Sequence, residues 1–259
     1  MLGFILSKMQ MLFFAVAISV VALLFYSFVS NIGLSESANN LLLSNSRVIS
    51  DQLNNDLLCS DKFAVLPDVL TKGFAADPFF YDLEFSKQTF GSEPNITNTL
   101  ILRIVEHKRS NQQKENVIAA KSISTEGEFV LVDAKFIVED SRVDSSYNDG
   151  KNTFISLYPR AASKTAVQAS APDAFVALKE IVGGKKTIYI IPCSTEKEPN
   201  NCIRNILRVG CYKLSKKTNL LDSDLIPSCF NKSTSVSDTI DVTRNYTWGD
   251  CKNLFGLTS

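Results

Sequence analysis

Six cysteines are the residues of this chain whose type and number carry the clearest chemistry. No two of them have the C-x-x-C spacing of a redox centre or of a structural zinc site, and the chain has a single histidine, His107. An even set without metal-binding spacing is typical of disulfides formed in an oxidising compartment, with free buried thiols as the alternative. Spacing alone does not choose the pairing. The disulfide candidates are Cys59, Cys193, Cys202, Cys211, Cys229 and Cys251.

No catalytic, cofactor-binding or metal-binding motif is recognisable. The chain lacks the nucleophile elbow, the phosphate-binding P-loop, the zinc-protease helix motif and the dinucleotide-binding glycine fingerprint. His107 stands among charged residues at the end of a predicted strand, where a solvated histidine is expected. Asp82 and Glu84 lie on the polar face of one strand, which is a pattern typical of a solvated surface. We therefore predict no enzymatic activity, no cofactor and no metal.

Three asparagines begin the acceptor pattern for N-linked glycosylation. They are Asn95, Asn231 and Asn245, each followed two residues later by Ser or Thr. A chain this rich in Asn, Ser and Thr contains about this many sequons by chance. The three are therefore compatible with a glycoprotein at the cell surface without requiring one.

The composition is that of a folded protein without a nucleic-acid partner. Hydrophobic residues make up 45% and charged residues 21% of the 259, which suits one medium domain or two small ones beside an anchor. Lys+Arg and Asp+Glu are both 27. Binding to phosphates needs a basic surface, so this balance argues against a nucleic-acid binder.

An uncharged apolar stretch near the N-terminus predicts a transmembrane helix. Residues 9–30 contain no charged side chain, and a helix of that length reaches about 30 Å, the thickness of a bilayer core. A cleaved signal sequence is the alternative, although its apolar core is usually shorter. Lys8 precedes the stretch, and the next basic residue is Arg47. The positive-inside rule then places the N-terminus in the cytoplasm and the rest of this single-pass protein outside, with the lipid bilayer as its partner.

A second helical pattern follows the predicted span. Apolar residues recur at spacings of three and four between Leu34 and Leu57, which predicts an amphipathic helix, straight or bent at Gly33. This stripe must be covered either by the protein's own sheet or by neighbouring copies. The candidate assembly stripe consists of Leu41, Leu42, Val48, Leu53 and Leu57.

The remainder reads as an α+β head with a mainly antiparallel sheet. Alternation of apolar and polar residues starts near Tyr81 and predicts successive strands without helices between them. A helix is predicted from Ser170 to Gly183, and residues 187–191 read as a central strand. We predict five segments: a cytoplasmic leader (1–8), a transmembrane helix (9–30), an amphipathic helix (31–58), an α+β extracytoplasmic domain (59–192) and a cysteine-rich C-terminal region (193–259). Further strands are expected at 100–105, 117–123, 128–138 and 153–157.

This layout resembles that of type IV pilin-like proteins, especially archaeal ones. In that family a short leader ending in a basic residue precedes an apolar helix, whose second half packs on a β-rich head. Lys8 would be the basic residue and Gln10 the first residue after cleavage. The chain departs from the family at Met9, where glycine or alanine is usual, and at Phe14, where many pilins carry a glutamate. The region from Leu57 to Tyr81 also looks like a segment of archaeal single-span proteins.

The resemblance implies a structural or interaction protein, such as a minor pilin-like subunit of a surface filament. Its partners would be other copies, or other pilin-like proteins, bound through the N-terminal helix. The alternative is a single-span ligand-binding or sensory ectodomain. A large apolar pocket would favour the alternative, whereas a lollipop shape with an exposed apolar helix would favour the structural protein.

Overall fold

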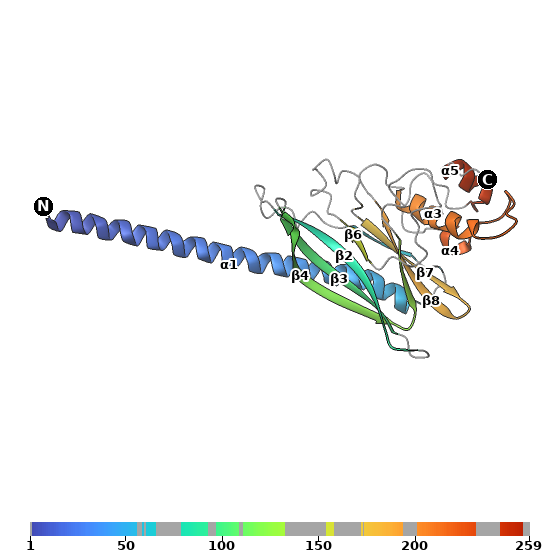
Figure 1. Ribbon diagram of the computed structural model, residues 1–259, viewed down its shortest axis with the longest axis horizontal. Coiled ribbons are helices and arrows are strands. Elements are labelled where there is room, and N and C mark those ends of the chain that lie inside the picture. Colours follow the sequence, from blue (N-terminus) through green and yellow to red (C-terminus); the bar gives the residue numbers. More distant parts are fainter. Residues whose placement is uncertain are drawn as a thin grey trace.

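The protein consists of one long N-terminal helix and a head of two β-sheets and short helices (Figure 1). The computed structural model describes residues 2–55, 59, 61–65, 79–92, 97–108, 111–132, 154–157, 172, 174–193, 201–231 and 244–255. The helices are α1 (Leu2–Asn54), α3 (Asn201–Ser215), α4 (Ser228–Asn231) and α5 (Trp248–Phe255). The strands are β1 (Asp61–Val65), β2 (Phe79–Phe90), β3 (Thr97–Lys108), β4 (Asn111–Thr125), β5 (Glu128–Leu131), β6 (Phe154–Leu157), β7 (Ala174–Val182) and β8 (Lys185–Cys193).

Helix α1 is a single helix of 53 residues that continues through Gly33. It contains no proline, and its only glycines are Gly3 and Gly33, so nothing in it removes a backbone hydrogen bond. The kink that the sequence allowed at Gly33 is absent from this helix. Its first half projects from the head and its second half runs into it (Figure 1).

The first sheet has the strand order β4-β3-β2-β6, and all its pairs are antiparallel. Strand β3 alternates in the way that the sequence indicated: Leu100, Leu102 and Ile104 are buried, and the residues between them are only partly buried. The prediction of successive antiparallel strands in this part of the chain is confirmed. Of the long strand expected at 128–138, the structure gives β5, and residues 133–138 lie outside the described part of the chain.

The second sheet has the strand order β1-β7-β8-β5, and the pair β5–β8 is parallel. Strand β8 lies between β7 and β5, so the predicted central strand is confirmed. Strands β7 and β8 form a hairpin whose turn, Gly183-Gly184, has positive φ at both residues (58° and 81°). Glycine adopts that conformation without the strain a side chain would bring.

The helix predicted from Ser170 to Gly183 is wrong, because its described residues form β7 and the turn after it. Residues 174–180 of β7 are all buried, since the strand is covered on both faces. A strand buried on both faces does not alternate, and its apolar spacing can match that of a helix by accident. The two glycines that looked like a helix end are the hairpin turn.

A hydrophobic cluster fills the space between the two sheets. Phe85 of β2 and Phe175 of β7 meet there edge to face, with ring centroids 5.1 Å apart. Four residues of α1 belong to the same buried cluster: Ala38, Leu41, Leu42 and Ile49. The second half of α1 therefore shares one core with both sheets.

The opposite face of the second sheet carries a second hydrophobic cluster with the short helices. Val176 and Leu178 of β7 contribute from the sheet, and Ile203, Ile206 and Leu207 contribute from α3. In the sequence this region reads as short apolar pieces, and α3 was not predicted. Gly210 lies where α3 meets α4 so closely that a Cβ would overlap the side chains of Ile226 and Phe230. The cysteine-rich C-terminal region is thus continuous with the core of the head.

Three disulfides join all six cysteines, as the sequence predicted. Cys193–Cys202 links the end of β8 to the start of α3, and Cys211–Cys251 links α3 to α5. Cys59–Cys229 joins the chain just beyond α1 to α4, across a sequence separation of 170 residues. Helix α3 is therefore held covalently to β8 and to α5, and α4 is held to the segment that follows α1.

Candidate functional site

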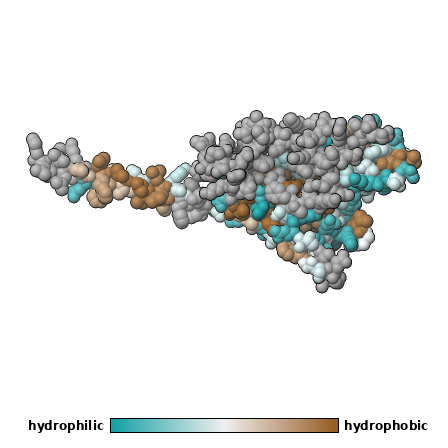
Figure 2. Space-filling model, in the orientation of Figure 1, coloured by the Kyte–Doolittle hydropathy of each residue, from teal (hydrophilic) through white to brown (hydrophobic). Residues whose placement is uncertain are grey.

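The exposed apolar half of α1 is the most unusual surface of the described structure. Residues Met9–Ser27 form a helix with a mean hydropathy of 2.2, and none of its residues is buried in the protein. These 19 residues span about 28 Å, close to the thickness of a bilayer core. Figure 2 shows the described part of this rod as mostly hydrophobic. By length and composition it is a candidate membrane span, and a signal sequence near an N-terminus has the same properties.

The polar groups within this segment are compatible with a lipid environment. Backbone groups are bonded within the helix, as any segment in hydrocarbon requires. The hydroxyl of Ser19 donates to the Ala15 carbonyl oxygen at 2.8 Å, one turn earlier. Such a bond satisfies the hydroxyl internally, so Ser19 adds little to the cost of inserting the helix.

The head begins close to the end of the apolar segment. Ser27 is the last residue of the candidate span, and Ala38, eleven residues later in the same helix, is fully buried in the head. A helix covers about 16 Å over that interval. A head attached in this way would lie next to the headgroup region of a bilayer.

The candidate assembly stripe lies largely within the protein's own core. Leu41 and Leu42 are 6% and 2% exposed, and Val48 and Leu53 are partly buried against the same cluster. Leu57 lies outside the described residues. Self-association through this stripe required the head to leave it open, and the head covers Leu41 and Leu42.

A buried polar cluster joins the second sheet to α3. Tyr189 of β8 donates its hydroxyl proton to Glu180 Oε2 of β7 at 2.9 Å. Lys213 of α3 pairs with the same carboxylate oxygen and lies 3.0 Å from the Tyr189 hydroxyl oxygen. Its Nζ also lies 4.6 Å from the centroid of the Phe230 ring, an arrangement that favours a cation. Each of these polar groups has a partner within the cluster, so the cluster links the second sheet to α3.

The sequence did not reveal this cluster, because its polar members come from three separate elements, one of them the misassigned β7. It also did not reveal Lys179, which is fully buried in β7. The expectation that Glu84 lies on a solvated strand face is wrong. Glu84 is buried and pairs with Arg103 on the neighbouring strand at 2.8 Å, and the Asp82 side chain lies outside the described part.

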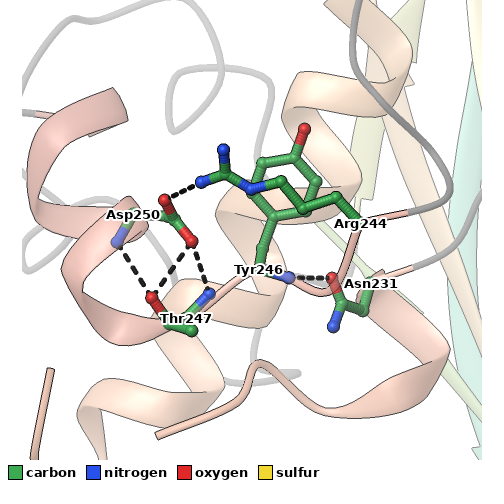
Figure 3. Close-up of polar contacts among 5 residues, drawn as sticks. All are labelled: Asn231, Arg244, Tyr246, Thr247 and Asp250. Carbon is green, nitrogen blue, oxygen red and sulfur yellow. Dashed lines mark hydrogen bonds and ion pairs between the residues drawn. The ribbon is translucent and has the colours of Figure 1, made fainter. Parts of the chain in front are cut away.

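A capping box begins α5 and is shown in Figure 3. The Thr247 Oγ1 accepts from the Asp250 backbone N–H at 3.3 Å, and Asp250 Oδ2 accepts from the Thr247 N–H at 2.9 Å. Arg244 pairs with the other oxygen of Asp250. The T-x-x-D pattern was a readable helix-start signal that the sequence analysis did not use.

The sequon asparagines have different surroundings. Asn231 is 6% exposed, and its Oδ1 accepts from the backbone N–H of Tyr246 at 2.8 Å (Figure 3). Asn245 is exposed in the segment that leads into α5. Asn95 lies outside the described residues.

Among the side chains that the structure describes, no group of three or more His, Cys, Asp or Glu residues could hold a metal ion. The His107 side chain is outside that set. Comparison of the chain with protein-family models, with curated proteins and with solved structures found no match. A function for this chain is therefore proposed from its own sequence and geometry.

Proposed function

We propose that this chain is a single-span membrane protein that holds a structural or interaction domain on the outer face of the membrane. One observation carries the proposal: α1 is one uninterrupted helix that is uncharged and exposed over Met9–Ser27 and packs into the head over its second half. A soluble protein rarely exposes so large an apolar surface, because water disfavours it. Lipid, or another copy of the same segment, would cover it.

The proposed orientation places the N-terminus in the cytoplasm and the head outside. Lys8 supports it, because positive charge next to a span stays on the cytoplasmic side. The three disulfides support it as well, since such bonds persist in oxidising compartments. The two arguments are independent, one from the anchor and one from the head.

The finer proposal is a pilin-like subunit, in which the amphipathic half of α1 packs on the head and the apolar half associates with other copies. The division of one helix into a covered and an uncovered half supports this proposal. Because the head covers Leu41 and Leu42, we assign association to Met9–Ser27. In lipid that contact would depend on close packing of small residues such as Ala15, Ser19 and Ala22.

Topology is tested with protease added to intact cells or right-side-out spheroplasts. We expect digestion of the head without lysis. Ile18→Arg should reduce membrane integration, because an arginine at mid-span costs about 2.5–3.5 kcal/mol. Asn40→Arg is the matched control, since Asn40 is exposed on the same helix beyond the span, and it should integrate normally. Digestion of the head only after lysis would contradict the proposed orientation.

Association is tested by placing single cysteines at successive positions from Phe14 to Val20. The native cysteines are all bonded, so a membrane-permeant bifunctional thiol reagent should cross-link only the added ones. We expect cross-linked dimers at every third or fourth position, and none from the matched control Asn54→Cys, which is exposed at the far end of α1. An absence of cross-links at all scanned positions would refute the pilin-like assembly and leave an isolated surface protein.

A further inference from the structure

Two glycosylation sequons lie in the same layer of the head in opposite surroundings. Asn231 ends α4 and is 6% exposed, whereas Asn245 precedes α5 and is exposed. Both match the acceptor pattern, one as Asn-Lys-Ser and the other as Asn-Tyr-Thr. The structure therefore separates two sites that the sequence cannot distinguish.

We propose that Asn245 is a site of N-linked glycosylation and that Asn231 is not. The inference rests on the proposed function, because the head must face the compartment in which glycans are attached. It goes beyond that function by assigning a covalent modification to one residue.

The side chain of Asn231 has a structural task that a glycan would disrupt. Its Oδ1 receives the Tyr246 N–H at 2.8 Å, and it neighbours Cys229 and Phe230, both buried in the second hydrophobic cluster. Because only 6% of Asn231 is exposed, a sugar on its Nδ2 would displace side chains that pack around it. A chain modified there could not close the core, so folded molecules should carry an unmodified Asn231.

The modification of Asn245 is a glycosyl transfer with no change of oxidation state. Its Nδ2 attacks C1 of the first sugar of a polyprenyl-phosphate-linked oligosaccharide, and a membrane oligosaccharyltransferase catalyses the step. The C–N bond forms as the C–O bond to phosphate breaks. The amide loses one proton to a base, and the lipid phosphate leaves.

The hydroxyl of the same sequon predicts when this transfer occurs. In the folded protein Thr247 Oγ1 lies 3.0 Å from Asp250 Oδ2 and accepts from the Asp250 N–H, so it is occupied by the capping box. A transferase that binds this hydroxyl needs it free. Transfer to Asn245 therefore precedes closure of the first turn of α5, and the exposed glycan then remains compatible with the fold.

The position of α5 also suits a glycan. Helix α5 lies at the end of the head opposite the projecting half of α1 (Figure 1). An oligosaccharide on the residues that precede α5 would extend into solvent, away from the membrane. It would not compete with the contacts proposed for Met9–Ser27.

The test uses the full chain with Asn95→Gln, produced in a host that glycosylates Asn-x-Ser/Thr outside the cytoplasm. Peptide mass spectrometry of the membrane-extracted protein should find one glycan, on Asn245. Asn245→Gln should remove it, and Asn231→Gln should leave it in place. Non-reducing peptide mapping and protease accessibility of the head are measured on the same sample.

Three outcomes would overturn the inference. An unmodified Asn245 in a protein with three disulfides and a protease-accessible head overturns it and leaves the proposed topology standing. A glycan on Asn231 in the folded protein overturns the argument from burial. Reduced cysteines together with a protected head overturn the topology and the inference with it.

Discussion

The disulfide Cys59–Cys229 should contribute more to the stability of the head than Cys193–Cys202. The first closes a loop with a sequence separation of 170 residues, and the second one of 9. A cross-link reduces the conformational entropy of the unfolded chain by an amount that grows with the logarithm of loop length. That relation gives about 5 kcal/mol for the long loop and about 3 kcal/mol for the short one.

The burial of the cysteines predicts the opposite order of stability loss. Comparing the two variants therefore distinguishes the effect of loop entropy from that of packing. Cys193 and Cys202 are 0% and 1% exposed, whereas Cys229 is 7% exposed and Cys59 is partly buried. Replacing each pair with alanine removes the same atoms, and the loss of packing is greater where burial is more complete. The long-loop variant will be the less stable one only if the difference in loop entropy between the two disulfides exceeds the difference in packing energy between their sites.

The assay is thermal and guanidinium unfolding of the full chain in detergent micelles. Trp248 is the only tryptophan and packs partly buried against the second hydrophobic cluster, so its fluorescence reports on the helical layer. We expect the midpoint of Cys59→Ala/Cys229→Ala to lie about 5–10 °C below that of Cys193→Ala/Cys202→Ala. Peptide mapping must first show that the two remaining disulfides are intact in each variant. Equal midpoints, or a lower midpoint for the short-loop variant, would refute the reasoning.

Two further changes test the interior of the head. Gly210→Ala should lower the unfolding midpoint, because overpacking against Ile226 costs about 1–3 kcal/mol and exceeds the gain of about 1 kcal/mol in helix propensity. Gly33→Ala, with no atom within 4 Å of the new Cβ, should not lower it, and a comparable drop there would contradict this explanation. A double-mutant cycle of Glu180→Gln and Lys213→Met should give a coupling energy of about 1–3 kcal/mol in guanidinium unfolding. Additive effects would show that the ion pair does not tie the sheet to α3.

The sequence correctly predicted those parts of the fold whose surroundings leave a pattern in neighbouring residues. Strand β3 of the first sheet alternates because one face meets the core, and Leu100, Leu102 and Ile104 mark that face clearly. The apolar half of α1 could be predicted because no charged residue interrupts a stretch long enough to span a bilayer core. In both cases the pattern depends only on neighbouring residues.

The misassigned parts depend on distant contacts. Strand β7 is covered by α3 on one face and by the first sheet on the other, and no local pattern reveals a second cover. Helix α3 has apolar residues at helical spacing, including Ile203, Ile206 and Leu214, but asparagines and cysteines concealed its start. The disulfide pairing joins residues up to 170 apart, so it follows from the topology and not from spacing.

The buried polar cluster of the head could not be predicted from the sequence either. Glu180, Tyr189 and Lys213 come from three elements, and only the β7–β8 hairpin and the docking of α3 bring them together. The sequence showed both sequons, but it did not show that Asn231 is buried and Asn245 exposed.

The continuity of α1 has a mechanical consequence on the proposed topology. Because the apolar half and the half inside the head are one helix, any inclination of the span is transmitted to the head without a hinge. Spans in bilayers incline by about 20° on average, and more when the hydrocarbon layer is thin. Over the roughly 40 Å from Ser27 to Asn54, an inclination of about 20° moves the outer end sideways by about 14 Å. Bilayer thickness would then affect how closely the head approaches the membrane surface.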